Sequence, residues 1–388
     1  MKMIKHILKL AWNRKRGFTG ILFEQALIML FLTVFLTNIF GLLKRHRTPG
    51  VLDTRNTIVL GWNTLRNLNE GEDLVQARKN VIENIKRQPY ILAVAQTKNL
   101  TPYFELFSRH TIDSLTIDNQ RIGVHIKGSD EHGISVFRPV LEQGEWLLDR
   151  KLDNDTEPVV ITRQLADRAG WDNALGKQIT IGSRTHTVVG VVSGLKHAPF
   201  EDSPPAVVIP VYLFDPGEII YAVRLKDSNA KDEFFLTVYH ETKRLMALDL
   251  VEPVLIEIDS FKRLSVFQQT VGLIFFGIAI VFLTFFAFLG AFGLFMLYAQ
   301  RNFKEYALRM ALGSGRRKLI YTVVMEALVI TFVAILPAFV VFLFAYSFAQ
   351  ITGFLVAASV MFLFSSISAW APAWKVSKMN PAEALQYE

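Results

Sequence analysis

Cysteine is absent from this sequence of 388 residues. Without cysteine the chain forms no disulfide bond, so any domain outside the cytoplasm must be stable without covalent cross-links. The absence also excludes thiolate metal sites and catalysis by a thiol nucleophile.

The motifs of common catalytic and nucleotide-binding sites are missing as well. No G-x-x-x-x-G-K-[ST] phosphate loop occurs, because the lysine and the hydroxyl near residues 313–317 fall in the wrong places. No H-E-x-x-H pair and no G-x-S-x-G nucleophile elbow is present. We therefore expect a chain that is not itself an enzyme and that holds no cofactor and no metal.

Long apolar runs are what the sequence has instead, within a hydrophobic content of 51%. A helix needs ~20 apolar residues to cross a bilayer, and four segments are that long. The first and second spans are expected to continue outward as stalk helices, because no helix-breaking residue separates the apolar run from the polar flank. The predicted parts are a first span with its stalk (18–47), an external domain (48–264), a stalk with the second span (265–300), a third span (320–347) and a fourth span (352–371).

The basic residues predict the orientation of these spans. Residues 1–17 form an expected amphipathic helix on the inner membrane surface, and residues 1–16 hold lysine and arginine but no acid. Arg316, Arg317 and Lys318 precede the third span, which places residues 301–319 in the cytoplasm by the positive-inside rule. Residues 44–47 are basic on the opposite side, but the inner clusters are larger. Both termini and the tail, residues 372–388, are therefore predicted to be cytoplasmic.

The net charge of +7 lies mainly beside the spans, so it does not indicate nucleic-acid binding.

The external region has an alternating α/β pattern. Residues 70–87 suit a helix and residues 90–95 a strand, and the pattern recurs as a strand, a helix and a strand over residues 219–258. Between these two units, about residues 138–210, lies a predicted β-rich insert with a hairpin turning at Gly182 and Ser183. The predicted fold class is an α-helical membrane protein with four transmembrane helices and a large extracytoplasmic α/β domain.

The segment between the second and third spans is predicted to be a short amphipathic helix. Its apolar contacts are expected from Tyr306, Leu308, Met310, Ala311 and Leu312. A soluble partner could bind a compact helix that is fixed between two membrane spans, and could move the spans through it. By spacing alone, Glu305 and Arg309 are an i,i+4 surface pair.

These residues carry a family resemblance. RNFKEYALRMALGSGRRKLIYTVVMEALVI resembles the signature of the FtsX/MacB-type permeases of ABC transporters, and NPAEALQYE resembles the closing segment of that family. GEWLLD, VVITRQLADRAGW, LGKQITIG and TVVGVV are similar to the small β-rich subdomain called the sabre, which here would lie between porter-like halves. The resemblance implies an ATPase-coupling role for Arg301, Glu305, Arg309, Ala311 and Gly313, and a tail motif at Asn380, Pro381 and Glu383.

The resemblance also implies the partners. A separate cognate ATPase subunit would bind ATP and magnesium, and the chain would act as a homodimer or as a heterodimer with a related permease in the bacterial inner membrane. Membrane lipids, a periplasmic adaptor and an outer-membrane channel complete the expected partners. The implied function is mechanotransmission for efflux of a drug, peptide or lipid-linked cargo. The alternatives are regulation of a cell-wall hydrolase, sensing of or resistance to an antimicrobial peptide, and a membrane-anchored enzyme or receptor without an ATPase.

Two acidic residues lie within the predicted spans, Glu24 and Glu326. Each is eight residues from a basic cluster, or ~12 Å along a helix, so both are expected near the inner leaflet. Ionisable groups at membrane depth indicate function by default. The alternative, which we favour at this shallow depth, is structural pairing with the basic residues at 14–16 and 316–318.

Overall fold

The computed structural model describes residues 15–64, 72–103, 112–117, 120–152, 155–246, 251–301, 303–312 and 314–378. The chain divides into two compact units, which we describe separately. The helical unit contains residues 1–44 and 270–388, and the sheet unit contains residues 45–269. Most of the predicted N-terminal amphipathic helix and the end of the tail lie outside the described residues.

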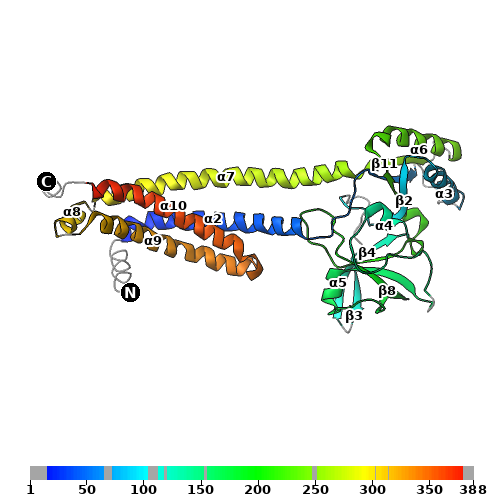
Figure 1. Ribbon diagram of the computed structural model, residues 1–388, viewed down its shortest axis with the longest axis horizontal. Helices are drawn as coiled ribbons and strands as arrows, with labels where there is room; N and C mark the ends of the chain where they lie inside the picture. Colours follow the sequence, from blue (N-terminus) through cyan, green and yellow to red (C-terminus); the bar gives the residue numbers. More distant parts are fainter. Residues whose placement is uncertain are drawn as a thin grey trace. The chain divides into compact units, whose positions relative to one another are not determined.

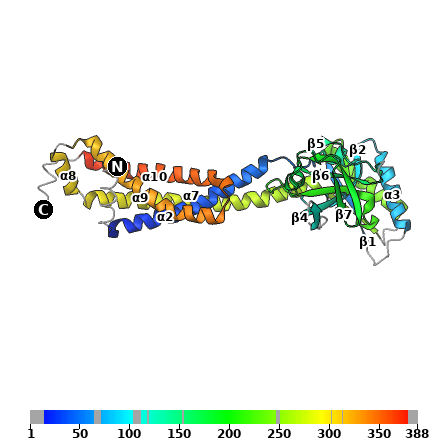
Figure 2. The same cartoon turned by 90° about the horizontal axis from the view of Figure 1, so that it is seen from below.

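Four long helices make up most of the described part of the helical unit (Figures 1 and 2). They are α2 (Lys15–Arg47), α7 (Ile258–Arg301), α9 (Arg316–Ala345) and α10 (Ile351–Ser377). Each is long and apolar enough to cross a membrane, so the prediction of four transmembrane helices is confirmed. The bounds of α2 and α7 run past the division between the units, and α7 has 44 residues, more than the ~20 that a span needs.

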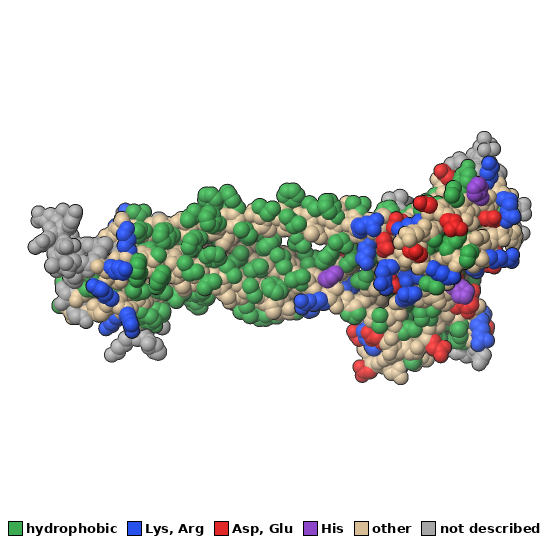
Figure 3. Space-filling view, turned by 45° about the horizontal axis from the view of Figure 1, so that its top comes forward, with side chains coloured by type: hydrophobic (Ala, Val, Ile, Leu, Met, Phe, Trp, Pro, Cys, Tyr) green, Lys and Arg blue, Asp and Glu red, His purple; other side chains and the backbone are tan. Residues whose placement is uncertain are grey.

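Three of the four helices share a buried core. Met29 of α2, Phe342 of α9 and Phe354 of α10 are among its members, all less than a tenth exposed. The α7 helix joins mainly through Ala291 and Phe295, which pack against α9 and α10. In the most apolar stretch of α7 no described residue is fully buried, and hydrophobic side chains cover the visible face of the long helices (Figure 3). Most of this helix therefore presents its apolar side chains to lipid or to another chain.

The sheet unit is built on a mixed sheet of eleven described strands in the order β11-β1-β10-β2-β4-β9-β6-β8-β5, with β3 beside β4 and β7 beside β8. Among the described strand pairs, β4–β9 and β6–β8 are parallel and the others are antiparallel. The strands are β1 (Thr57–Thr64), β2 (Ile91–Lys98), β3 (Ile112–Ile117), β4 (Gln120–Ser129), β5 (Leu141–Gly144), β6 (Glu157–Thr162), β7 (Gln178–Ile181), β8 (Arg184–Val192), β9 (Ala206–Pro210), β10 (Ile220–Leu225) and β11 (Val251–Glu257).

Short helices cover the sheet or connect its strands. The α3 and α6 helices lie together over one end of it (Figure 1), because the buried faces of Val81, Ile85, Phe234 and Val238 pack on β1, β2 and β10. The α-helices are α3 (Glu72–Lys86), α4 (Gly133–Phe137), α5 (Arg163–Arg168), α6 (Lys231–Leu245) and, in the helical unit, α8 (Phe303–Ala311). The described 3-10 helices are η1 (Val211–Leu213), η2 (Pro216–Glu218) and η3 (Ser228–Ala230) in the sheet unit and η4 (Phe348–Gln350), which joins α9 to α10 in the helical unit.

The predicted β-rich insert is joined to the rest of the sheet. Strand β4 pairs with β2 through Thr97 and Ser129 and with β9 in parallel register, so the sheet continues from one half into the other. Val124 of β4 and Leu115 of β3, which precede the expected insert at 138–210, lie in the same hydrophobic core as the insert strands. The predicted hairpin at Gly182 is confirmed, with Ile181 opposite Arg184.

A lysine is buried in the middle of this sheet. Lys127 on β4 is 5% exposed, and its ammonium donates one hydrogen bond to the carbonyl oxygen of Asn99 at 2.6 Å. Burial lowers the pKa of Lys127 from 10.5 to about 8. Since the folded chain releases this proton more readily than the unfolded chain, the penalty for the buried charge is fully present below pH ~8 and is relieved as the pH rises toward 10.5.

We expect Lys127→Met to raise the thermal unfolding temperature of the sheet unit in the full chain at pH 7.5. The gain should shrink as the pH rises to 9.5, because the wild-type lysine then sheds its charge in the folded state. Lys177→Met, at an exposed position, is the matched control and should change little. A gain for Lys127→Met that stayed constant from pH 7.5 to 9.5 would contradict the burial argument.

Candidate coupling sites

The predicted coupling helix exists as α8 and is firmly held by the spans that follow it. Tyr306 and Ala307 of α8 are almost fully buried. Tyr306 packs in one cluster with Leu319 and Val323 of α9 and with Ala373 of α10. A force applied to α8 would therefore reach the third and fourth spans through packed side chains.

The outward face of α8 differs from the prediction. Leu308 and Leu312 were expected among the apolar contacts, but they are 51% and 79% exposed. They are four residues apart, and the amide of Leu312 still bonds to the carbonyl oxygen of Leu308 at 3.0 Å. Residues at this spacing lie on the same side of a helix, so Leu308 on α8 and Leu312 directly after α8 form an exposed apolar pair.

The residues that the family motif singles out lie within α8 or next to it in the sequence. Arg301 is exposed at the end of α7, and Glu305 is half-buried in the first turn of α8. Arg309 and Ala311 are on α8, but their side chains lie outside the described residues, as does Gly313. The tail residues Asn380, Pro381 and Glu383 also fall outside, so the structure does not test the coupling and tail roles.

The two acidic residues of the spans have different surroundings. Glu326 is 7% exposed on α9. Glu24 is half-buried on α2, and its carboxylate lies against α7 at Gly290, where a Cβ atom would stand 2.4 Å from Oε1. Within the described residues Glu24 has no hydrogen-bond or ion-pair partner. Its expected pairing with residues 14–16 stays a prediction, because those side chains lie outside the described part of the chain.

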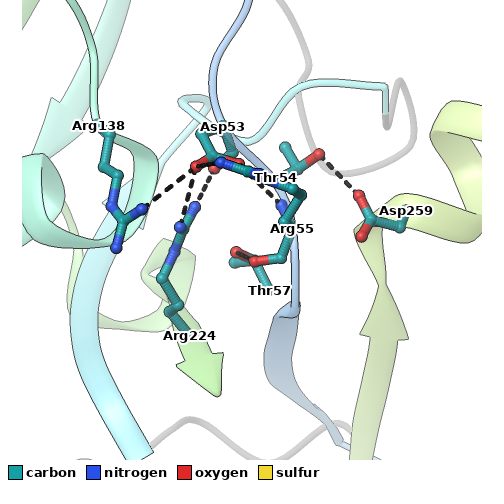
Figure 4. A network of polar contacts seen from close by, with 7 residues as sticks. All are labelled: Asp53, Thr54, Arg55, Thr57, Arg138, Arg224 and Asp259. Atoms are coloured by element: carbon teal, nitrogen blue, oxygen red, sulfur yellow. Dashed lines mark hydrogen bonds and ion pairs between the residues drawn. The ribbon is translucent and has the colours of Figure 1, made fainter. Parts of the chain in front are cut away.

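A charged network that the sequence did not predict lies in the sheet unit, where the chain leaves α2 (Figure 4). The Asp53 carboxylate accepts hydrogen bonds from Arg55 Nε at 3.0 Å and from Arg224 Nη1 at 3.1 Å, and Arg138 is 3.6 Å away. Burial alone would raise the pKa of Asp53, but the hydrogen bonds from Arg55 and Arg224 bring it well below its usual range. Arg224 is 3% exposed, so this carboxylate is the counter-ion of a buried guanidinium.

The end of α2 is held by a second contact. Lys196, which is 3% exposed, donates from Nζ to the carbonyl oxygens of Arg45 and Thr48, the latter at 2.7 Å. The two carbonyl oxygens lie at and just past the C-terminal end of α2, so the ammonium there caps the helix and complements its dipole. Arg45 also pairs with Asp202 at 3.0 Å, and His46 stacks on Phe200. The basic residues at 44–47, which oppose the positive-inside rule, are thus partly accounted for by contacts in the sheet unit.

The beginning of α7 enters the same region. Thr54, directly after Asp53, donates from Oγ1 to Asp259 in the first turn of α7 at 2.9 Å (Figure 4). Ile258, the first residue of α7, and Leu52, which follows α2, are both buried in one hydrophobic core with strands of the sheet. Residues next to the two stalk helices are therefore joined through one core and one polar network.

Comparisons with known proteins follow this division of the chain. Residues 39–234 match the model of the MacB-like periplasmic core domain, which is half of the chain, and residues 277–381 match the FtsX-like permease C-terminal model. A search of curated proteins returned no match.

Three solved structures are similar to the chain. The periplasmic region of MacB from Actinobacillus actinomycetemcomitans is 16% identical, with 54% of this chain and 92% of that chain covered and a TM-score of 0.39. A domain of a permease protein from Porphyromonas gingivalis is 16% identical over 52% of this chain and 90% of its own, with a TM-score of 0.37. The extracellular domain of the transporter YknZ from Gram-positive bacteria is 13% identical over 51% and 100%, with a TM-score of 0.35.

The two family matches lie where the sheet unit and the last three spans lie, in the order that the sequence motifs predicted. The chain therefore belongs to the FtsX/MacB-type permeases of ABC transporters.

Proposed function

We propose that this permease transmits movement from a separate ATPase subunit, bound at α8, to the sheet unit on the other side of the membrane. One observation carries the proposal: residues next to the two stalk helices are joined by a common core that contains Leu52 and Ile258. A displacement of the spans would then move the base of the sheet unit as a whole. The work would be efflux of a drug, peptide or lipid-linked cargo, with regulation of a cell-wall hydrolase or a response to antimicrobial peptides as the alternative.

The proposed assembly is a dimer, with itself or with a related permease, in the bacterial inner membrane. Both termini and α8 face the cytoplasm, and the sheet unit faces the periplasm. ATP and magnesium are bound by the ATPase subunit. A periplasmic adaptor and an outer-membrane channel would complete the assembly in the case of efflux. The exposed apolar side chains of α7, among them Phe275, Phe276 and Val281, support contact with a second permease or with lipid.

The contact with the ATPase is assigned to the exposed apolar pair on α8. We expect Leu308→Asp combined with Leu312→Asp to weaken binding of the ATPase about tenfold or more, because charged side chains would replace apolar ones at the centre of the contact. Both residues are exposed, so the chain should still fold. Copurification of the ATPase and its hydrolysis rate in reconstituted bilayers measure the effect.

Glu305→Lys is expected to leave ATP hydrolysis uncoupled from transport.

Leu236→Asp is the matched control, since Leu236 is 60% exposed on α6 in the sheet unit. It makes the same chemical change away from the proposed contact and should leave ATPase binding unchanged. Unaltered copurification and hydrolysis with the doubly substituted α8 would refute the assignment of the ATPase contact to this helix.

A further inference from the structure

A cavity of about 250 Å³ opens between α2 and α7 within the helical unit. Its walls are almost entirely hydrocarbon, and Glu24 is the one ionisable residue among those that line it. The lining residues are Glu24, Leu27, Ile28, Phe31, Ile280, Leu283, Thr284 and Phe286. An apolar pocket with a few placed polar groups is the usual form of a small-molecule site in a protein.

The carboxylate in this cavity is placed by the backbone of the facing helix. Gly290 has no side chain, and this leaves room for the Glu24 carboxylate. A Cβ atom built on Gly290 would stand only 2.4 Å from Oε1 of Glu24. Glu24 has no hydrogen-bond or ion-pair partner within the described residues. An unpaired carboxylate at membrane depth is costly, and a cation that bound there would offset much of that cost.

A second, smaller cavity adjoins the first, since Ile28 and Thr284 line both. Its volume is about 30 Å³, enough for one or two water molecules. Ser365 and Ser368 of α10 line it, are at most 3% exposed, and have hydroxyls without a hydrogen-bond partner in the described residues. Buried hydroxyls of this kind are usually satisfied by water or a ligand, so polar groups extend from Glu24 toward the middle of the bundle.

We propose that the cavity between α2 and α7 binds a single-chain amphiphile that carries an ammonium group. The ammonium would pair with Glu24, and the hydrocarbon part would lie along Leu27, Phe31 and Phe286. The cavity is small for a complete drug-sized ligand, so part of the chain would remain in the surrounding lipid. Entry from the bilayer is possible because Leu27, Phe31 and Phe286, which line the cavity, are 44–53% exposed. The binding site is independent of the ATPase contact on α8.

The test uses the full chain in nanodiscs of phosphatidylglycerol, a lipid without an ammonium group. The probe is dodecylamine with a diazirine near the end of its chain, and mass spectrometry measures photolabelling of residues 24–31 and 280–286. We expect labelling that unlabelled dodecylamine competes away and dodecanol does not. Glu24→Gln should reduce it about tenfold, since the amide keeps the shape and loses the charge. Gly290→Ala should reduce it to a smaller extent by displacing the carboxylate.

Gly293→Ala is the matched control, because a Cβ atom at Gly293 on the same helix meets nothing within 4 Å. It should label like the wild type, and all variants should remain monodisperse. Labelling of Glu24→Gln within about twofold of the wild type would overturn the proposal, as would equal labelling by a dodecanol probe. Displacement by added phosphatidylethanolamine, with free dodecylamine having no effect, would also overturn it by making a membrane lipid the occupant. These measurements need no ATPase, so their failure would leave the proposed function standing.

Discussion

Of the Gly→Ala substitutions in the membrane spans, Gly353→Ala should destabilise the helical unit most. A Cβ atom at this position on α10 would stand 2.4 Å from the Cα atom and 2.6 Å from the backbone nitrogen of Thr37 on α2. Backbone atoms of a packed helix cannot turn aside as a flexible side chain does, so the two helices must separate. Overpacking of this kind costs roughly 1–3 kcal/mol, and we expect the upper end of that range.

The measurement is the temperature at which the reconstituted chain loses its helical circular dichroism and its monodispersity. Gly293→Ala again serves as the control, since it adds the same methyl group to a span where nothing lies within 4 Å. An unchanged transition temperature for Gly353→Ala would show that α2 and α10 do not approach as closely as the structure indicates.

Removal of the Asp53 carboxylate is the second large effect that we expect. In Asp53→Ala, Arg224 keeps its charge at 3% exposure without its carboxylate partner, which typically costs about 3–5 kcal/mol. The sheet unit should therefore unfold at a clearly lower denaturant concentration. Arg55→Met is the comparison: the Arg55 side chain is 77% exposed, so the loss of its pair with Asp53 should cost much less.

The pH dependence of the same contact has a definite sign. The pKa of Asp53 is lower in the folded chain than its ordinary value of 3.8, so the folded state favours the ionised form. The stabilisation is complete above pH ~4 and is lost as the pH falls toward the folded-state pKa. The difference in stability between the wild type and Asp53→Asn should therefore be constant from pH 5 to 8. A difference that vanished within that range would exclude the carboxylate as its source.

Several features of the sheet unit were accessible from local sequence patterns. The apolar positions of residues 70–87 recur at helical spacing, and α3 buries Val81, Ile82 and Ile85 as expected. The turn at Gly182 was predictable because glycine favours the left-handed backbone region that tight turns need. The structure places Gly182 there, with a φ of +62°. The parallel pairing of β4 with β9 was not predictable, since it joins residues about 80 positions apart and leaves no local signal.

The candidate sites, too, were only partly predictable from the sequence. The α8 helix was found from its amphipathic pattern and its family motif, but the pattern could not tell which apolar residues face inward. Tyr306 is buried because α9 and α10 both pack against it, whereas Leu308 and Leu312 stay exposed. Lys196 and Asp53 gave no local signal, because their roles depend on the end of α2 and on Arg224, which lie more than 140 residues away in the sequence.

The sequence by itself determined the four membrane-spanning helices, the α/β character of the intervening region and the family. Each of these depends on composition, periodicity or a contiguous motif, which are properties of neighbouring residues. Only the tertiary structure decided which side chains meet: Glu24 against Gly290, Thr37 against Gly353, and Arg224 with Asp53. Such contacts depend on how distant segments pack, and the same local pattern is compatible with many packings.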